Sequence, residues 1–141
     1  MNAWNILVRD DNAAHRASAE HQLAGHNLTV VSSYNEASEL LESNIKFDMA
    51  LLDLMMPAAD MRTLGENAKE FHGKELPMGT ILAFQALKAG VKKVAVLTDT
   101  NHHNHPASAA FDYLGGSWNN PSPIRVGDAR MFFTNYLHRS F

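Results

Sequence analysis

The stretch LLDLMMP, residues 51–57, decides the fold class of this sequence. It completes an apolar run over residues 47–54 that is interrupted only by Asp48 and Asp53. A short apolar run of this kind is typical of a strand that is buried on both faces of a parallel sheet. The carboxylate of Asp53 is therefore predicted to stand at the carboxyl end of a central strand.

Two further apolar runs also end in polar side chains. The run ILV at residues 6–8 is followed by Arg9, Asp10 and Asp11, and the run VAVL at residues 94–97 is followed by Thr98. Each is short and rich in β-branched residues, which indicates a buried strand. Residues 28–31 and 131–133 are the remaining strand candidates.

Helix signals lie between these strands. Asn12 is placed to cap a first helix, Ser33 and Glu36 form a capping-box pattern at a second, and Thr80 is placed to cap a third. Residues 107–114 have helical spacing after Pro106. Alternating strands and helices predict an α/β domain with a parallel sheet and right-handed crossovers.

Composition limits the classes of protein that this sequence can belong to. The chain has 141 residues, no cysteine and a formal net charge of −3. Disulfides and thiolate metal sites are excluded, and there is no dense run of Lys and Arg to bind nucleic acid. No stretch approaches the roughly 20 apolar residues of a membrane span, and the N-terminus lacks a secretory signal pattern. We expect a cytoplasmic protein with no direct contact to nucleic acid or membrane.

The carboxyl ends of parallel strands meet at one edge of a sheet, where ligands of open α/β sheets bind. Asp10, Asp11 and Asp53 are therefore expected in one crevice with the Thr98 hydroxyl. Crowded carboxylates repel one another unless they share a proton or a cation. Hard oxygen ligands favour Mg²⁺ or Mn²⁺. Such an ion can assist phosphoryl transfer, and a carboxylate can be the nucleophile.

These motifs resemble the receiver domains of bacterial response regulators. ILVRDDN (residues 6–12) is similar to their first strand and acidic pair, LLDLMMP to their phosphoacceptor strand, and VAVLTDT (residues 94–100) to their fourth strand. The resemblance covers residues 5–114. It implies a doubly wound, flavodoxin-like domain of receiver type, with a five-stranded parallel sheet in the order 2-1-3-4-5 and helices on both faces.

The resemblance also implies roles for single residues. Asp53 would be the phosphoacceptor, and Thr98 the hydroxyl that bonds the phosphoryl group and moves on phosphorylation. Asp10, Asp11, Asp53 and the backbone carbonyl of Met55 would hold Mg²⁺. A histidine kinase or a phosphotransfer protein would supply the phosphoryl group.

The sequence departs from the receiver pattern at two cationic positions. The lysine that pairs with the phosphoryl group is missing: its position falls on Gly116, or near Thr134 or Asn135, depending on the alignment. Arg9 occupies a usually apolar position. Its guanidinium could replace the lysine or hold the acidic cluster together, but the favoured interpretation is a strand-end arginine that reaches solvent.

Two segments depart from the pattern in length. A polar insertion occupies residues 55–79 directly after the predicted site, where it is either a lid or a surface elaboration. The C-terminal segment, residues 116–141, is irregular and leaves too few residues for a substantial last helix. An uncovered flank could bind a partner or a second copy of the chain. We expect one receiver-like domain over residues 1–141.

A histidine-rich run, TNHHNHP at residues 100–106, follows the fourth predicted strand. His102, His103 and His105 lie on the same predicted rim as Asp53. Imidazoles there could bind a transition metal, shuttle protons or accept a phosphoryl group. The spacing matches no zinc motif, and an exposed loop is the default interpretation.

Three functions are compatible with the sequence. The first is a stand-alone signalling receiver of a two-component system, phosphorylated on Asp53 with Mg²⁺, which acts on a downstream protein partner and has no substrate to turn over. The second is a pseudo-receiver that only binds a protein partner. The third is a small metal-dependent phosphohydrolase.

Overall fold

A computed structural model describes residues 2–57, 70–71, 74–98, 109 and 123–135. Its elements, in chain order, are β1 (Asn5–Arg9), α1 (Ala13–Gln22), β2 (Asn27–Val31), α2 (Tyr34–Glu42), β3 (Met49–Asp53), β4 (Met56–Pro57), β5 (Glu75–Leu76), α3 (Gly79–Lys88), β6 (Lys93–Thr98), β7 (Ile124–Val126) and β8 (Ala129–Asn135).

The main sheet has six strands in the order β2-β1-β3-β6-β8-β7. The first five of these strands are parallel, and their order is the 2-1-3-4-5 order that the resemblance implied. The predicted number of strands was wrong, because β7 adds an antiparallel edge strand beside β8. The sequence predicted an irregular segment here. Gly127 instead lies in the turn of the β7–β8 hairpin. Its φ of 62° is a backbone conformation that glycine adopts readily.

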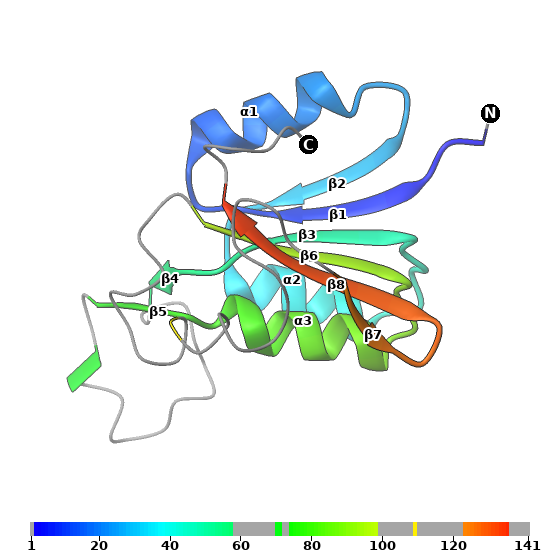
Figure 1. Cartoon of the computed structure of the whole chain (residues 1–141). Coiled ribbons are helices and arrows are strands. Elements are labelled where there is room, and N and C mark those ends of the chain that lie inside the picture. Colours follow the sequence, from blue (N-terminus) through cyan, green and yellow to red (C-terminus); the bar gives the residue numbers. More distant parts are fainter. Residues whose placement is uncertain (1, 58–69, 72–73, 99–108, 110–122, 136–141) are drawn as a thin grey trace.

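The helices lie on both faces of the sheet (Figure 1), as predicted. The helices α2 and α3 cover one face, where Ala37 and Leu82 pack with Leu7, Leu52 and other buried residues of the strands. Helix α1 lies on the opposite face, where its buried Ala19 packs with Ile6 and Val8 of β1 in a second, smaller cluster. Apolar burial on both faces explains why β1, β3 and β6 are almost continuously hydrophobic.

The first two helices begin where the sequence predicted. The Asn12 side chain accepts hydrogen bonds from the backbone N–H groups of Ala14 and His15 at the start of α1. The Ser33 hydroxyl oxygen accepts a bond of 3.2 Å from the N–H of Glu36 at the start of α2. Each side chain satisfies N–H groups that have no partner within the helix.

The third helix begins differently from the prediction. Thr80 is not its cap: α3 starts at Gly79 after Met78, and no side chain caps it. Gly79 lies directly against β3, and its N–H donates to the Leu54 carbonyl at 2.9 Å. A Cβ atom at Gly79 would lie 2.3 Å from the Asp53 carbonyl oxygen. Glycine therefore allows the backbone of α3 to approach the strand that carries Asp53.

The insertion forms a small second sheet where it is described. Strand β4 pairs with β5 in an antiparallel ladder, with Met56 opposite Leu76 and Pro57 opposite Glu75. The predicted helix over residues 107–114 lies outside the described residues except for Ala109, which is helical. Within the described part of the chain, no helix is long and apolar enough to cross a membrane.

Candidate functional site

Three carboxylates meet at the carboxyl ends of β1 and β3. These two strands are adjacent and parallel, with Arg9 opposite Leu52, so Asp10 and Asp53 emerge at the same edge. Asp10, Asp11 and Asp53 each offer a carboxylate oxygen, and these oxygens all lie within 4.8 Å of one another. Asp10 and Asp53 are buried, whereas Asp11 is exposed.

Asp10 is fixed by contacts on every side. Its Oδ1 accepts a 2.8 Å hydrogen bond from the N–H of Asn12, and its Oδ2 lies 3.1 Å from His15 Nδ1. Its backbone carbonyl accepts a 2.8 Å bond from Arg16 Nη1. Its backbone N–H donates to the Val31 carbonyl at 3.1 Å. The carboxylate is therefore oriented before any ligand arrives.

Asp53 has a strongly perturbed pKa. Burial raises the pKa of Asp53 to about 9, helped by the charge of Asp10 and a hydrogen bond with Asp11, and only partly opposed by Arg9. An isolated carboxyl in this position holds a proton near neutral pH. A cation among the three carboxylates would favour the ionised form, which is the form that can attack phosphorus.

The donor set fits a hard divalent ion. The pocket between the three carboxylates is lined by Asp10, Asp11 and Asp53, together with Met55, whose carbonyl can add an oxygen ligand. Oxygen ligands of this kind suit Mg²⁺ or Mn²⁺. Thr98 ends β6, the strand next to β3, and it is 1% exposed.

Arg9 does not reach solvent, and the favoured interpretation of this residue was wrong. Its exposed fraction is 0%, and its Nη1 lies 3.7 Å from Asp53 Oδ2. The same atom makes a long contact of 3.5 Å with the Met55 carbonyl oxygen. Residue 9 is at the very end of β1, so its long side chain can turn toward the strand-end crevice instead of away from it.

No cation stands at the lysine position on the fifth parallel strand. Strand β8 ends in Thr134 and Asn135, and Thr134 is buried opposite Leu97 of β6. The other alignment placed the lysine at Gly116, which lies outside the described residues, as do His102, His103 and His105.

Two residues of the site were missed by the sequence interpretation. His15 lines the pocket and contacts Asp10. Its place in the first turn of a helix that starts directly after β1 could have indicated this. Glu75 also lines the pocket, from β5 of the insertion. No local pattern could have indicated Glu75, because the path of the insertion brings it there.

Comparison with known proteins places the fold. No protein-family model and no curated protein sequence matches this chain. Among solved structures, a CheY-like response regulator receiver domain protein from Methanospirillum hungatei JF-1 is 19% identical, with a TM-score of 0.56 over 96% of this chain and 82% of that chain. The BeF3-activated DrrB receiver domain is 16% identical, with a TM-score of 0.48 over 71% of this chain and 69% of that chain.

A third similar structure is the beryllofluoride-activated NtrC receiver domain. It is 25% identical, with a TM-score of 0.43 over 84% of this chain and 80% of that chain. The fold assignment depends on the Methanospirillum protein, whose TM-score exceeds 0.5. Its likeness extends over nearly the whole chain, and the sheet order agrees. The chain has the fold of the response regulator receiver domains.

Proposed function

We propose that this protein is a signalling receiver of a two-component system, which accepts a phosphoryl group on Asp53 with the help of Mg²⁺. The observation that carries the proposal is the position of Asp53 at the end of the central strand β3, with the carboxylates of Asp10 and Asp11 beside it. The receiver fold supports the same conclusion.

The proposed reaction is an in-line phosphoryl transfer. A carboxylate oxygen of Asp53 attacks the phosphorus of a phosphohistidine or a small phosphodonor, and an acyl phosphate bond forms as the bond from phosphorus to the donor nitrogen or oxygen breaks. The donor keeps the electron pair of the broken bond and takes up a proton. Bound Mg²⁺ would offset the negative charge that builds up on the phosphoryl oxygens.

The surrounding residues would bind the ion and contact the transferred phosphoryl group. Asp10 and Asp11 would hold the ion with Asp53 and the Met55 carbonyl. The Thr98 hydroxyl would donate a hydrogen bond to an oxygen of the new phosphoryl group. The chain itself would be the acceptor of the phosphoryl group, with a kinase or a phosphotransfer protein as donor and a further protein as the output partner.

Intact-mass measurement with a small phosphodonor tests the proposal. The wild-type protein with acetyl phosphate and Mg²⁺ should gain one phosphoryl group, and chelation of Mg²⁺ should prevent the gain. Asp53→Asn should remain unlabelled. Asp48→Asn is the matched control, because Asp48 lies at the amino end of β3 and accepts a backbone hydrogen bond from Asn5 at 2.8 Å. An unlabelled wild-type protein, or a labelled Asp53→Asn variant, would contradict the proposal.

A second candidate is a pseudo-receiver that binds a partner without phosphorylation. Two observations favour it: the contact of Arg9 with Asp53, and the buried Thr134 where receivers have a lysine. This candidate predicts that phosphodonor and Asp53→Asn leave partner binding unchanged.

A further inference from the structure

Arg9 is the largest fully buried side chain among the described residues. Its Nε and Nη2 atoms have no hydrogen-bond partner within the described part of the chain. Its Nη1 contacts Asp53 Oδ2 at 3.7 Å and the Met55 carbonyl oxygen at 3.5 Å. Burying a guanidinium with so few partners is unfavourable. The two oxygen contacts are therefore what compensates for its burial.

Both oxygens belong to groups that would bind the divalent ion. A guanidinium and a divalent ion repel each other and use the same oxygen lone pairs. We propose that Arg9 is a built-in counter-cation that competes with the divalent ion for Asp53 and the Met55 carbonyl. This inference rests on the metal site of the proposed function, and it adds a residue that lowers the affinity of that site.

The competition gives the site two arrangements. Without the ion, the guanidinium of Arg9 contacts the Asp53 carboxyl and the Met55 carbonyl oxygen. When the ion binds, the guanidinium must give up its contacts with Asp53 and Met55, and the free energy of this displacement is subtracted from the free energy of metal binding. The site would then respond only to a higher concentration of Mg²⁺ than the same three carboxylates would otherwise require.

Titration calorimetry with MgCl₂ on the intact chain tests this inference. Arg9→Met has a similar length and no charge, so it should bind Mg²⁺ roughly tenfold more tightly than the wild type. Arg9→Lys keeps the charge and should remain near the wild type. Arg16→Met is the matched control, because Arg16 donates to the backbone carbonyl of Asp10, whereas Arg9 contacts Asp53 and the Met55 carbonyl themselves. Its affinity should rise much less than that of Arg9→Met.

A second measurement needs no variant and therefore does not depend on the folding of Arg9→Met. In the wild-type protein, the NMR signal of the Arg9 Nε–H group should shift as MgCl₂ is added, in step with the calorimetric binding curve. If the wild type binds Mg²⁺ and this signal stays in place, or if Arg9→Met binds no more tightly than Arg16→Met, the inference about Arg9 is wrong and the metal site stands. If neither protein binds Mg²⁺, both are wrong.

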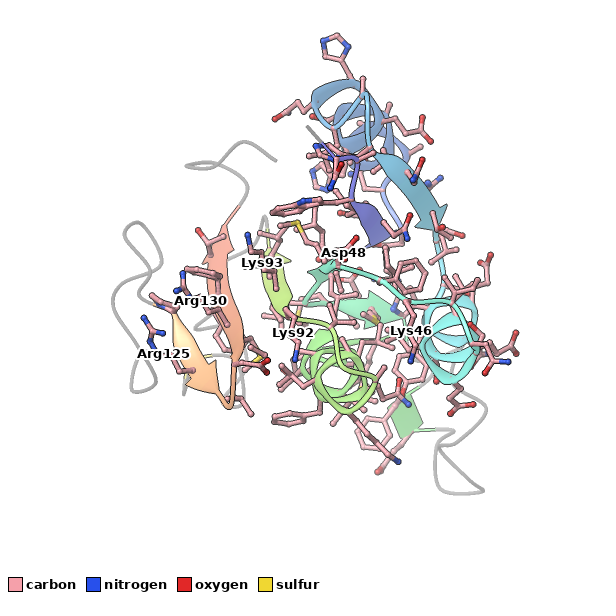
Figure 2. The ribbon with its side chains drawn as sticks, turned by 90° about the vertical axis from the view of Figure 1, so that its right-hand side faces the viewer. Lys46, Asp48, Lys92, Lys93, Arg125 and Arg130 are labelled. Carbon is pink, nitrogen blue, oxygen red and sulfur yellow. The ribbon has the colours of Figure 1, made fainter. Side chains whose placement is uncertain are left out.

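A different part of the molecule carries a second inference. Three cations lie on the face of the sheet against which α1 packs. Lys93 of β6 lies opposite Arg130 of β8, and Arg130 in turn lies opposite Arg125 of β7. Figure 2 shows these three cations next to one another along the amino-end edge of the sheet. All three are exposed. We call Lys93, Arg130 and Arg125 the cationic row.

The cationic row has no acidic partner within the described residues. Lys92, next to Lys93 in the chain, does have an acidic partner, because Lys92 Nζ lies 2.6 Å from Asp128 Oδ2. Lys93 Nζ instead lies 4.1 Å from the centre of the Trp4 ring. Like charges directly opposite each other on adjacent strands reduce stability. A surface of this kind is complementary to an acidic partner.

Apolar side chains continue from the cationic row along the same face. Ala95 of β6 lies opposite Phe132 of β8, and both are half-buried, as is Met49 of β3. Among the described helices, α2 and α3 pack on the other face, and α1 packs on β1. We also propose that this face binds an amphipathic helix of a partner protein, with apolar residues over Phe132 and acidic residues against the cationic row.

Fluorescence anisotropy with two designed peptides tests this second proposal. One labelled peptide is an amphipathic helix of leucine and glutamate, and the other has lysine in place of every glutamate. The glutamate peptide should bind and the lysine peptide should not. Lys93→Gln combined with Arg130→Gln should weaken binding at least tenfold. Lys74→Gln combined with Lys88→Gln is the matched control, because it removes two exposed lysines elsewhere on the surface.

Three outcomes would overturn the docking proposal. The first is absence of binding to the glutamate peptide. The second is an equal loss of binding in the two double variants, which would mean a general effect of net charge. The third is equal or tighter binding of a labelled single-stranded oligonucleotide with the same dependence on the cationic row, which would assign the surface to nucleic acid.

Discussion

At the scale of single residues, Asp53 combines a reactive position with an unfavourable environment. Burial raises its pKa to about 9, and Asp10 and Asp11 reinforce the rise. The folded, metal-free protein therefore binds a proton that the unfolded chain releases near pH 4. Below that pH both states hold the proton, and the carboxyl contributes its full stability. This contribution is lost as the pH rises toward 9.

Asp53→Asn should remove this dependence on pH. In EDTA, the free energy of unfolding of the variant should exceed that of the wild type by at least about 1 kcal/mol at pH 8, and the two should converge as the pH falls toward 4. Urea unfolding at several pH values measures the difference. A constant difference across the range would contradict the explanation by proton binding.

At the scale of elements, the contact between α3 and β3 controls the position of Asp53. A Cβ atom at Gly79 would lie 2.3 Å from the Asp53 carbonyl oxygen and 2.7 Å from Leu54 Cα. These are backbone atoms, which cannot rotate away as a flexible side chain could. The start of α3 and the end of β3 must therefore separate if any larger residue replaces Gly79.

Gly79→Ala should destabilise the protein by about 2–3 kcal/mol and weaken Mg²⁺ binding, because the clash moves Asp53. Helix propensity alone would favour alanine by about 1 kcal/mol, so the sign of the change distinguishes the two effects. Thermal unfolding and calorimetry measure both results. Thr80→Ala, one position along the same helix, should change stability by less than about 1 kcal/mol. Equal effects of the two variants would contradict this explanation.

At the scale of the whole molecule, the metal site joins two central strands of one sheet. Asp10 and Asp11 follow β1, and Asp53 ends β3, so an ion among them binds only when these strands are paired. Ligands that bind the folded state alone stabilise it according to their concentration. The sheet as a whole should therefore gain stability from the ion.

Mg²⁺ at 100 times its dissociation constant should raise the free energy of unfolding by about 2.7 kcal/mol. Urea unfolding with and without MgCl₂ measures the gain, with NaCl at equal ionic strength as the salt control. Asp11→Asn removes one ligand from the exposed side of the site and should reduce the gain, whereas Asp48→Asn should preserve it. A gain that NaCl reproduces would indicate screening of the carboxylates instead of a bound ion.

The sequence by itself determined the parallel sheet and the edge at which the acids meet. Alternating buried strands and capped helices are local patterns, and the carboxyl ends of parallel strands share an edge whatever the helices do. The receiver fold and the order of the parallel strands followed from the motifs around Asp10, Asp53 and Thr98. These features depend on neighbouring residues in the chain, so they could be predicted from it.

Only the tertiary structure decided what surrounds the acids. Arg9 turns inward because the Asp53 carboxyl, at the end of β3, and the Met55 carbonyl, just after β3, lie within its reach. Glu75 reaches the pocket through the path of an insertion, and the cationic row joins side chains from three strands. The hairpin of β7 and β8 turns at Gly127 and Asp128, which is a local signal, but its place beside β6 depends on pairing between distant strands. Contacts between distant segments follow from packing, which a single sequence does not reveal.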